Sequence, residues 1–269
     1  MGTPRANVHH VAPSLAAVAA LGLGAAGFIG ARAFEGHRRR NSAILNETLP
    51  VNSKWWREYA KHEGDLLYVA IGDSAAQGIG ASKPAHSYVG LLARRVRELT
   101  GRTVRVVNLS VSGATTALAV SNQLPRLRRL KPDLVTVAIG ANDIADFDPL
   151  RFEVNIREVF ASLPQHAVVA DLPSFYLPWN ERKVAAANRI VRTVAAQYGL
   201  QVAPLHATTL RRGIRGILTD FAIDMFHPND GGYQVWASAF LPAVTESVAG
   251  RLTLPVMTDA TTPAHTTSR

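Results

Sequence analysis

The chain has 269 residues, of which 47% are hydrophobic and 18% are charged, so it can form one domain with a sizeable core and tails. It contains no cysteine, which excludes disulfides and thiolate metal sites. The formal net charge is +9, but the arginines are scattered over predicted helices without interleaved aromatic residues. This pattern favours solvated helix faces and argues against nucleic-acid binding.

The first predicted element is the segment at residues 11–34, which is almost wholly small and apolar. As a helix it is long enough to span a bilayer, and arginines follow it at positions 38–40. Such a basic cluster favours a cytoplasmic location for the domain that follows. Ala31 and Ala33 have the spacing of a signal-peptide cleavage site, which would mean export to the cell envelope. We therefore expect residues 1–40 to be a membrane anchor or a signal segment, with the membrane side open; a buried domain helix is the third alternative.

Residues 41–62 are predicted to connect this segment to the main domain. Asn52 and Ser53 are placed to cap a short helix that continues to Glu63. The aromatic side chains on this helix fit a membrane interface or packing on the domain equally well. They are Trp55, Trp56 and Tyr59.

From Leu66 onward, apolar strand-like runs alternate with amphipathic helix-like segments. This alternation predicts an α/β domain at residues 63–252, in which a five-stranded parallel sheet has helices on both faces. Residues 253–269 are rich in Thr, Ala and Pro and are expected to form a disordered tail. The predicted strands are 66–71, 104–109, 134–139, 167–170 and 200–205, and the predicted helices are 88–99, 115–130 with a break near Pro125, 152–163, 181–198 and 232–252.

The first predicted strand ends in the short polar turn Gly72-Asp73-Ser74. Ligands bind at the carboxyl ends of strands in open α/β sheets, so Ser74 is a candidate nucleophile. A hydroxyl is a weak nucleophile and needs a base, an orienting acid and an oxyanion site. His227 can serve as the base, and Asp224, three residues earlier, can orient its ring. As oxyanion donors we choose the backbone N–H groups of Ser74 and Gly113 and the side-chain amide of Asn142.

Four blocks of the sequence, in this order, resemble those of the SGNH (GDSL-type) hydrolase family and its lysophospholipase L1-like esterases. The resemblance implies a three-layer, flavodoxin-like fold, with Ser74 as nucleophile, His227 as base and Asp224 as orienting acid. It also implies an oxyanion hole from Ser74, Gly113 and Asn142, and ester hydrolysis without a metal or a cofactor. Ala75-Ala76 stands where the family usually has Leu-Thr or Leu-Ser, which bears on the substrate and not on the chemistry. The blocks are Gly72-Asp73-Ser74, Gly113, Gly140-Ala141-Asn142-Asp143 and Asp224-Met225-Phe226-His227-Pro228.

The sequence thus predicts a serine esterase or lipase-type hydrolase that cleaves carboxylic esters through an acyl-enzyme on Ser74. The expected substrates are small-molecule, lipid or glycan esters, the expected membrane contact is through residues 11–34, and a monomer is expected. Two alternatives stay open: an acyltransferase that uses the same three residues, and a membrane-tethered binding module without catalysis. A metal site at Asp224, His227 and Asp230 is disfavoured, because no other His or acidic residue has paired spacing.

Overall fold

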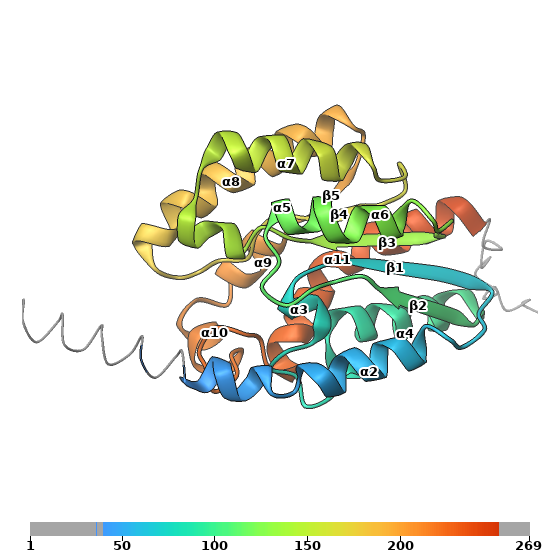
Figure 1. Cartoon of the computed structure of the whole chain (residues 1–269), viewed down its shortest axis with the longest axis horizontal. Coiled ribbons are helices and arrows are strands. Elements are labelled where there is room, and N and C mark those ends of the chain that lie inside the picture. The colour runs from blue at the N-terminus through green and yellow to red at the C-terminus, as the bar shows by residue number, and fades with distance from the viewer. Residues whose placement is uncertain (1–35, 37–39, 253–269) are drawn as a thin grey trace, which may run out of the picture.

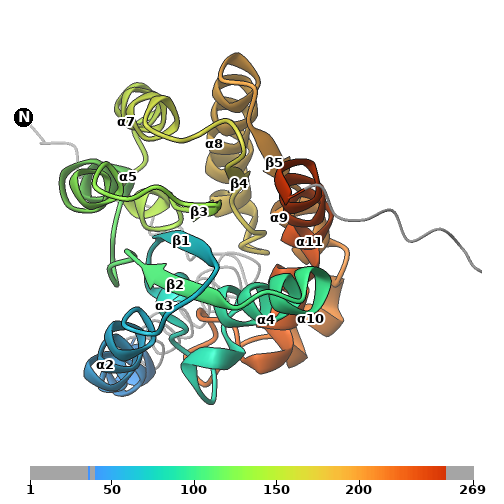
Figure 2. The same ribbon diagram turned by 90° about the vertical axis from the view of Figure 1, so that its right-hand side faces the viewer.

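The computed structural model describes residues 36 and 40–252 of the chain. Its centre is a five-stranded sheet in the order β2-β1-β3-β4-β5, with every neighbouring pair parallel (Figures 1 and 2). The predicted α/β class with five parallel strands is confirmed, and this strand order is that of flavodoxin-like folds. The strands are β1 (Leu66–Gly72), β2 (Val104–Asn108), β3 (Leu134–Ala138), β4 (Val168–Ala170) and β5 (Gln201–Ala203).

Helices cover both faces of the sheet, because its strands are apolar on both sides. In β1, Tyr68 and Ala70 belong to one hydrophobic core, while Val69 and Ile71 belong to the other. Figure 1 shows α7 and α8 on one side of the sheet and α2 and α4 on the other. The helices and turns are α2 (Leu49–Tyr59), α3 (Ser74–Gln77), η1 (Pro84–His86), α4 (Tyr88–Thr100), α5 (Thr116–Leu118), η2 (Ala119–Gln123), α6 (Leu124–Leu127), η3 (Asn142–Asp146), α7 (Pro149–Ala161), α8 (Pro178–Gln197), α9 (Leu205–Leu210), α10 (Gly213–Thr219) and α11 (Asp230–Leu252).

The helix predicted at 115–130 does break near Pro125, but it is also interrupted earlier. It consists of α5, the π-helical η2 and α6, and Pro125 lies in the first turn of α6. The missing N–H of proline removes one backbone donor where the helical pattern changes. The helices α9 and α10 were not predicted, and the fifth strand ends at Ala203 rather than Leu205.

The predicted helix cap at Asn52 and Ser53 is also wrong, because both residues lie inside α2. Asn52 is buried, and its side chain reaches across to α3 instead of capping its own helix. Trp56 of α2 is 3% exposed and belongs to the core on that face of the sheet. Of the two alternatives for these aromatic residues, the structure therefore favours packing on the domain for Trp56.

The predicted apolar segment at 11–34 and the predicted tail at 253–269 lie outside the described residues. Within the part of the chain that the structure describes, no helix is both long and apolar enough to cross a bilayer. The membrane anchor and the domain boundaries therefore stay predictions.

The carboxyl ends of the strands meet at one edge of the sheet. Gly72 at the end of β1 is paired with Ala138 at the end of β3, and Ala70 is paired with Asn108 at the end of β2. The segments that follow these three strands therefore emerge side by side, as expected for a ligand site in an open parallel sheet.

Candidate active site

Ser74 is the first residue of the short helix α3, which starts directly after β1. The carboxylate of Asp73 caps this helix by accepting a hydrogen bond from the N–H of Ala75 at 2.9 Å. As the first residue of α3, Ser74 has no helical acceptor for its own N–H. Ser74 is 6% exposed and is therefore largely buried at the sheet edge.

The structure brings Ser74, His227 and Asp224, hereafter called the triad, together in one hydrogen-bonded chain. His227 Nε2 lies 2.9 Å from Ser74 Oγ, although the two residues are 153 positions apart in the sequence. On the other side of the ring, His227 Nδ1 lies 2.6 Å from Asp224 Oδ2. A neutral imidazole that donates its Nδ1 proton to Asp224 leaves Nε2 free to accept the Ser74 proton.

A tight turn at residues 222–227, hereafter called the triad turn, presents His227 to the serine. Asp224 Oδ1 accepts hydrogen bonds from the backbone N–H groups of Phe226 at 3.1 Å and His227 at 3.0 Å. The N–H of Ala222 donates to the carbonyl of His227 at 2.8 Å and closes the turn. Met225 has a φ of +54°, a left-handed conformation that costs a non-glycine residue about 1–2 kcal/mol. Backbone strain of this kind is typical of functional sites.

Asp73 directly precedes Ser74, Asp224 lies behind His227, and the pKa values of these two buried carboxylates move in opposite directions. Burial alone would raise the pKa of Asp224, but hydrogen bonds from His227 and Ser42 and the charge that His227 can carry lower it to about 2. Burial raises the pKa of Asp73 to about 6, and its hydrogen bond from Ala75 only partly offsets this effect. Asp224 therefore stays ionised at neutral pH, as an orienting acid must.

The three predicted oxyanion donors lie at the same sheet edge, but one of them is engaged. The N–H groups of Ser74 and Gly113 donate to none of the described residues. Asn142 Nδ2 donates to the carbonyl of Ala114 at 3.0 Å and to Asp73 Oδ2 at 3.3 Å. Turning the Asn142 amide toward a bound substrate would exchange its long contact with Asp73 for one with the oxyanion.

Asp143 and Gln123 hold the segments around these donors in place. Asp143 accepts hydrogen bonds from the N–H of Thr116 at 2.9 Å and from its hydroxyl at 2.7 Å, which fixes the start of α5 just after Gly113. Gln123 is fully buried and bonds both the N–H and the carbonyl of Gly72, at 3.0 and 2.8 Å. The side chain of Gln123, at the end of η2, therefore fixes the backbone immediately before Asp73.

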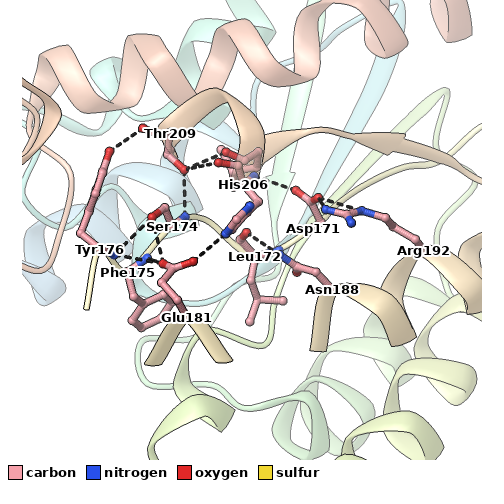
Figure 3. Close-up of polar contacts among 11 residues, drawn as sticks. Asp171, Leu172, Ser174, Phe175, Tyr176, Glu181, Asn188, Arg192, His206 and Thr209 are labelled. Carbon is pink, nitrogen blue, oxygen red and sulfur yellow. Dashed lines mark hydrogen bonds and ion pairs between the residues drawn. The ribbon is translucent and has the colours of Figure 1, made fainter. Parts of the chain in front are cut away.

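The loop between β4 and α8 forms a wall beside the triad turn. Its Phe175 ring meets the Phe226 ring edge-to-face at 6.4 Å, and Phe226 in turn contacts the His227 ring at 5.0 Å. Figure 3 shows the side chain of Glu181, in the first turn of α8, reaching back under this loop. Glu181 therefore supports the loop whose Phe175 ring packs against Phe226, the residue before His227.

The Glu181 carboxylate binds the loop through several donors at once (Figure 3). One oxygen accepts from the Ser174 hydroxyl at 2.9 Å and from the N–H groups of Phe175 and Tyr176 at 2.5 and 3.0 Å, while the other lies 2.8 Å from His206 Nε2. Burial opposes ionisation, but these hydrogen bonds prevail and lower the pKa of Glu181. The charged form of Glu181 thus fixes the loop in its observed conformation.

Sequence reasoning missed Gln123 and Glu181, together with Ser42, which contacts Asp224. The signal for Gln123 was a polar residue on the apolar face of a predicted helix, which indicates a buried hydrogen bond. No comparable signal marked Ser42 or Glu181, because each lies in an ordinary polar context in the sequence.

Asp230 belongs to a separate polar cluster. Its carboxylate accepts from the Ser82 hydroxyl at 2.6 Å and lies 2.8 Å from His86 Nδ1. Within residues 36 and 40–252, no group of three or more His, Asp or Glu side chains is arranged to hold a metal ion.

Known proteins match the region that carries these residues. A model of the GDSL-like lipase/acylhydrolase family matches residues 70–235. Esterase TesA of Pseudomonas aeruginosa is 30% identical over 166 residues, which cover 61% of this chain and 79% of that protein. The GDSL-like esterase Rv1075c of Mycobacterium tuberculosis is 24% identical over 253 residues, or 88% of this chain and 78% of that protein. Among solved structures, LAE5, an alpha/beta hydrolase enzyme from the metagenome of Lake Arreo in Spain, has a TM-score of 0.57 at 26% identity and covers 70% of this chain and 98% of its own.

Proposed function

The chain belongs to the GDSL-like lipase/acylhydrolase family and is a carboxylic ester hydrolase, and from this premise we propose that it acts through an acyl-enzyme on Ser74. One observation carries the proposal: Ser74 Oγ lies 2.9 Å from His227 Nε2, whose ring is held from behind by Asp224. This is the distance at which an imidazole takes a proton from an attacking hydroxyl.

The proposed reaction has two halves, each of which uses His227 twice. Ser74 Oγ attacks the ester carbonyl carbon while its proton passes to His227 Nε2, and a tetrahedral intermediate forms. The intermediate collapses, the bond to the alcohol oxygen breaks, and His227 protonates the departing alcohol. Water then attacks the acyl-enzyme with His227 as base, and the acid leaves as Ser74 regains its proton. Asp224 stabilises the imidazolium in each step without itself being protonated.

The negative charge on the carbonyl oxygen needs donors that are in place before the reaction. We assign this role to the N–H groups of Ser74 and Gly113 and to the amide of Asn142. The backbone N–H groups of Ser74 and Gly113 donate to no described residue and so can bind the oxyanion. The amide of Asn142 lies at the same edge, beside Asp73. One such donor typically contributes about 2.7–4 kcal/mol to transition-state stabilisation.

Apolar side chains around the triad turn favour an ester with an apolar acyl group. Ile223 is 56% exposed and Met225 is 40% exposed, and they flank Asp224 on both sides in the sequence. Phe175 and Phe226 add an aromatic wall next to His227. A substrate that covers these side chains removes apolar surface from water, at about 25 cal/mol per Å².

The test compares wild-type protein with Ser74→Ala on p-nitrophenyl esters from acetate to octanoate. We expect Ser74→Ala to lose about a thousandfold or more in kcat/KM, and a fluorophosphonate probe to label the wild type alone. Ser238→Ala is the matched control, because Ser238 is exposed on α11 and, among the described residues, its hydroxyl bonds only the carbonyl of Val235. Equal hydrolysis by wild type and Ser74→Ala would overturn the proposal.

The rate of the wild type should rise with pH on the acidic limb, because only the neutral imidazole accepts the serine proton. Acyl transfer by the same residues stays a prediction. Adding glycerol to the assay tests it, since a transferase forms acylglycerol at the expense of the free acid.

A further inference from the structure

A helical stretch ahead of the family region contacts the back of the triad acid. Residues 40–46 are helical, and Ser42 Oγ in this stretch donates a hydrogen bond to Asp224 Oδ2 at 2.7 Å. One residue earlier, Asn41 Nδ2 donates to the carbonyl of Ile223 at 2.8 Å. The family match begins only at residue 70, so these contacts come from a part of the chain that the family motifs do not include.

The same stretch of chain, continued into α2, also holds the helix that carries the nucleophile. Asn52 Nδ2 lies 3.3 Å from the carbonyl oxygens of both Gln77 and Gly78, at the end of α3. Trp56 Nε1 donates to the carbonyl of Gln77 at 3.1 Å. Ser74 starts this four-residue helix, so residues 40–59 hold the serine side and the aspartate side of the triad against one another.

We propose that Ser42 is a positioning residue for the reaction, which fixes the Asp224 carboxylate that orients His227. The inference rests on the proposed function, because it acts through the same three residues. Asp224 Oδ1 is occupied by two backbone N–H groups of its own turn, and Oδ2 is shared between the imidazole and Ser42. Asp224 is fully buried, so the Ser42 hydroxyl is the donor that comes from outside the turn and fixes the plane of the carboxylate from behind.

Removing the Ser42 hydroxyl should have two separable effects. The carboxylate loses a donor that fixes its plane, so kcat falls, by about tenfold, while KM for a short ester stays the same. The carboxylate also becomes a stronger acceptor for the imidazolium proton. The neutral base then forms at higher pH, and the acidic limb of the rate profile moves to higher pH in Ser42→Ala.

The experiment uses the full chain with Ser42→Ala, Ser42→Thr and the matched control Ser53→Ala. Ser53 lies in α2, in the same stretch, and no described residue hydrogen-bonds with its hydroxyl. Each variant is assayed on p-nitrophenyl acetate across pH for kcat and KM, and its melting temperature is measured. Ser42→Thr keeps a hydroxyl and should restore both kcat and the position of the acidic limb.

The proton in the hydrogen bond between His227 Nδ1 and Asp224 gives a readout that needs no substrate. Its far-downfield NMR resonance should move in Ser42→Ala and not in Ser53→Ala. If the wild type is active but Ser42→Ala has the same kcat, the same acidic limb and the same resonance position as Ser53→Ala, the role of Ser42 is refuted and the proposed function is not. If Ser74→Ala hydrolyses esters as fast as the wild type, the proposed function itself is refuted. The two failures are therefore distinguishable.

Discussion

Gly80 lies against the turn that carries His227, at a position where a larger residue does not fit. Its φ is +90°, and a Cβ atom placed there would collide with the carbonyl oxygen of Pro228. The same atom would come within 3.1 Å of the Cβ atoms of Ala222 and His227. Because the colliding atom belongs to the backbone, relief of the collision requires the turn itself to move.

We therefore predict that Gly80→Ala displaces His227 from Ser74 and that Gly101→Ala does not. Gly101 also has a positive φ, of +65°, but a Cβ there meets nothing within 4 Å. Both variants lose about 1–2 kcal/mol to the left-handed backbone. Only Gly80→Ala must also separate two backbone segments, and a catalytic group that is misplaced by about 1 Å can cost about a hundredfold in rate.

The assay is kcat on a p-nitrophenyl ester together with thermal unfolding of both variants. Gly101→Ala should keep its kcat and lose a few degrees of melting temperature, at roughly 2–4 °C per kcal/mol for a chain of this size. Gly80→Ala should lose more of its melting temperature and about a hundredfold in kcat. If the kcat of Gly80→Ala stays within twofold of that of Gly101→Ala, the proposed link between this loop and His227 is refuted.

Two carboxylates with shifted pKa values, buried Asp73 and partly exposed Glu181, give predictions that depend on pH. The folded chain holds the Asp73 proton up to about pH 6 and the unfolded chain releases it near 3.8, so stability falls as the pH rises through this range. Between pH 4 and pH 8, the unfolding free energy of Asp73→Asn should therefore rise by up to about 3 kcal/mol relative to that of the wild type. Urea denaturation measures both values, and a difference between the two proteins that does not change with pH contradicts the prediction. Glu181 has a lowered pKa, so its stabilisation is present above pH 4.5 and is lost as the pH falls further. Glu181→Gln should lower the melting temperature at pH 7 by about 4–8 °C and by less at pH 3.5, and an equal loss at both values would show that the charge is not the cause.

The parts of the fold that could be predicted from the sequence are those with a local signal. β1 is apolar on both faces because both of its faces are buried, and that pattern is visible in seven consecutive residues. Ser74 and Gly113 were identifiable because the polar turns after the strands stand out against the apolar runs. The parallel sheet then brings these turns to one edge without any further information.

The parts that could not be predicted depend on contacts between residues far apart in the chain. Ser42 and Asp224 are 182 positions apart, and nothing in either local sequence indicates that they meet. The π-helical turn η2 within the helix predicted at 115–130 is similar. Gln123 ends the π-helical turn η2 and points at the backbone of Gly72, 51 residues away. The hydrophobic pattern of a helix does not show that one of its polar side chains hydrogen-bonds the backbone of a distant strand.

The number of hydrogen-bond donors around each acid supports Asp224, and not Asp73, in the proposed role of orienting acid. Both carboxylates are buried, and burial by itself disfavours the charge on each of them. Asp73 accepts from Ala75 and, at long distance, from Asn142. Asp224 accepts from two backbone N–H groups of its turn, from the imidazole and from the hydroxyl of Ser42.

Asp224, with its pKa lowered to about 2, is ionised in neutral and mildly acidic solution, so it is suited to stabilise an imidazolium each time one forms. Asp73, with a pKa raised to about 6, would be partly neutral in mildly acidic solution and could not serve that purpose reliably. Its hydrogen bond to the N–H of Ala75 places it at the start of α3, where it fixes the backbone of Ser74. Asp73 and Asp224 are thus suited to different tasks because the chain supplies them with different numbers of donors, and one of the donors to Asp224 comes from residue 42.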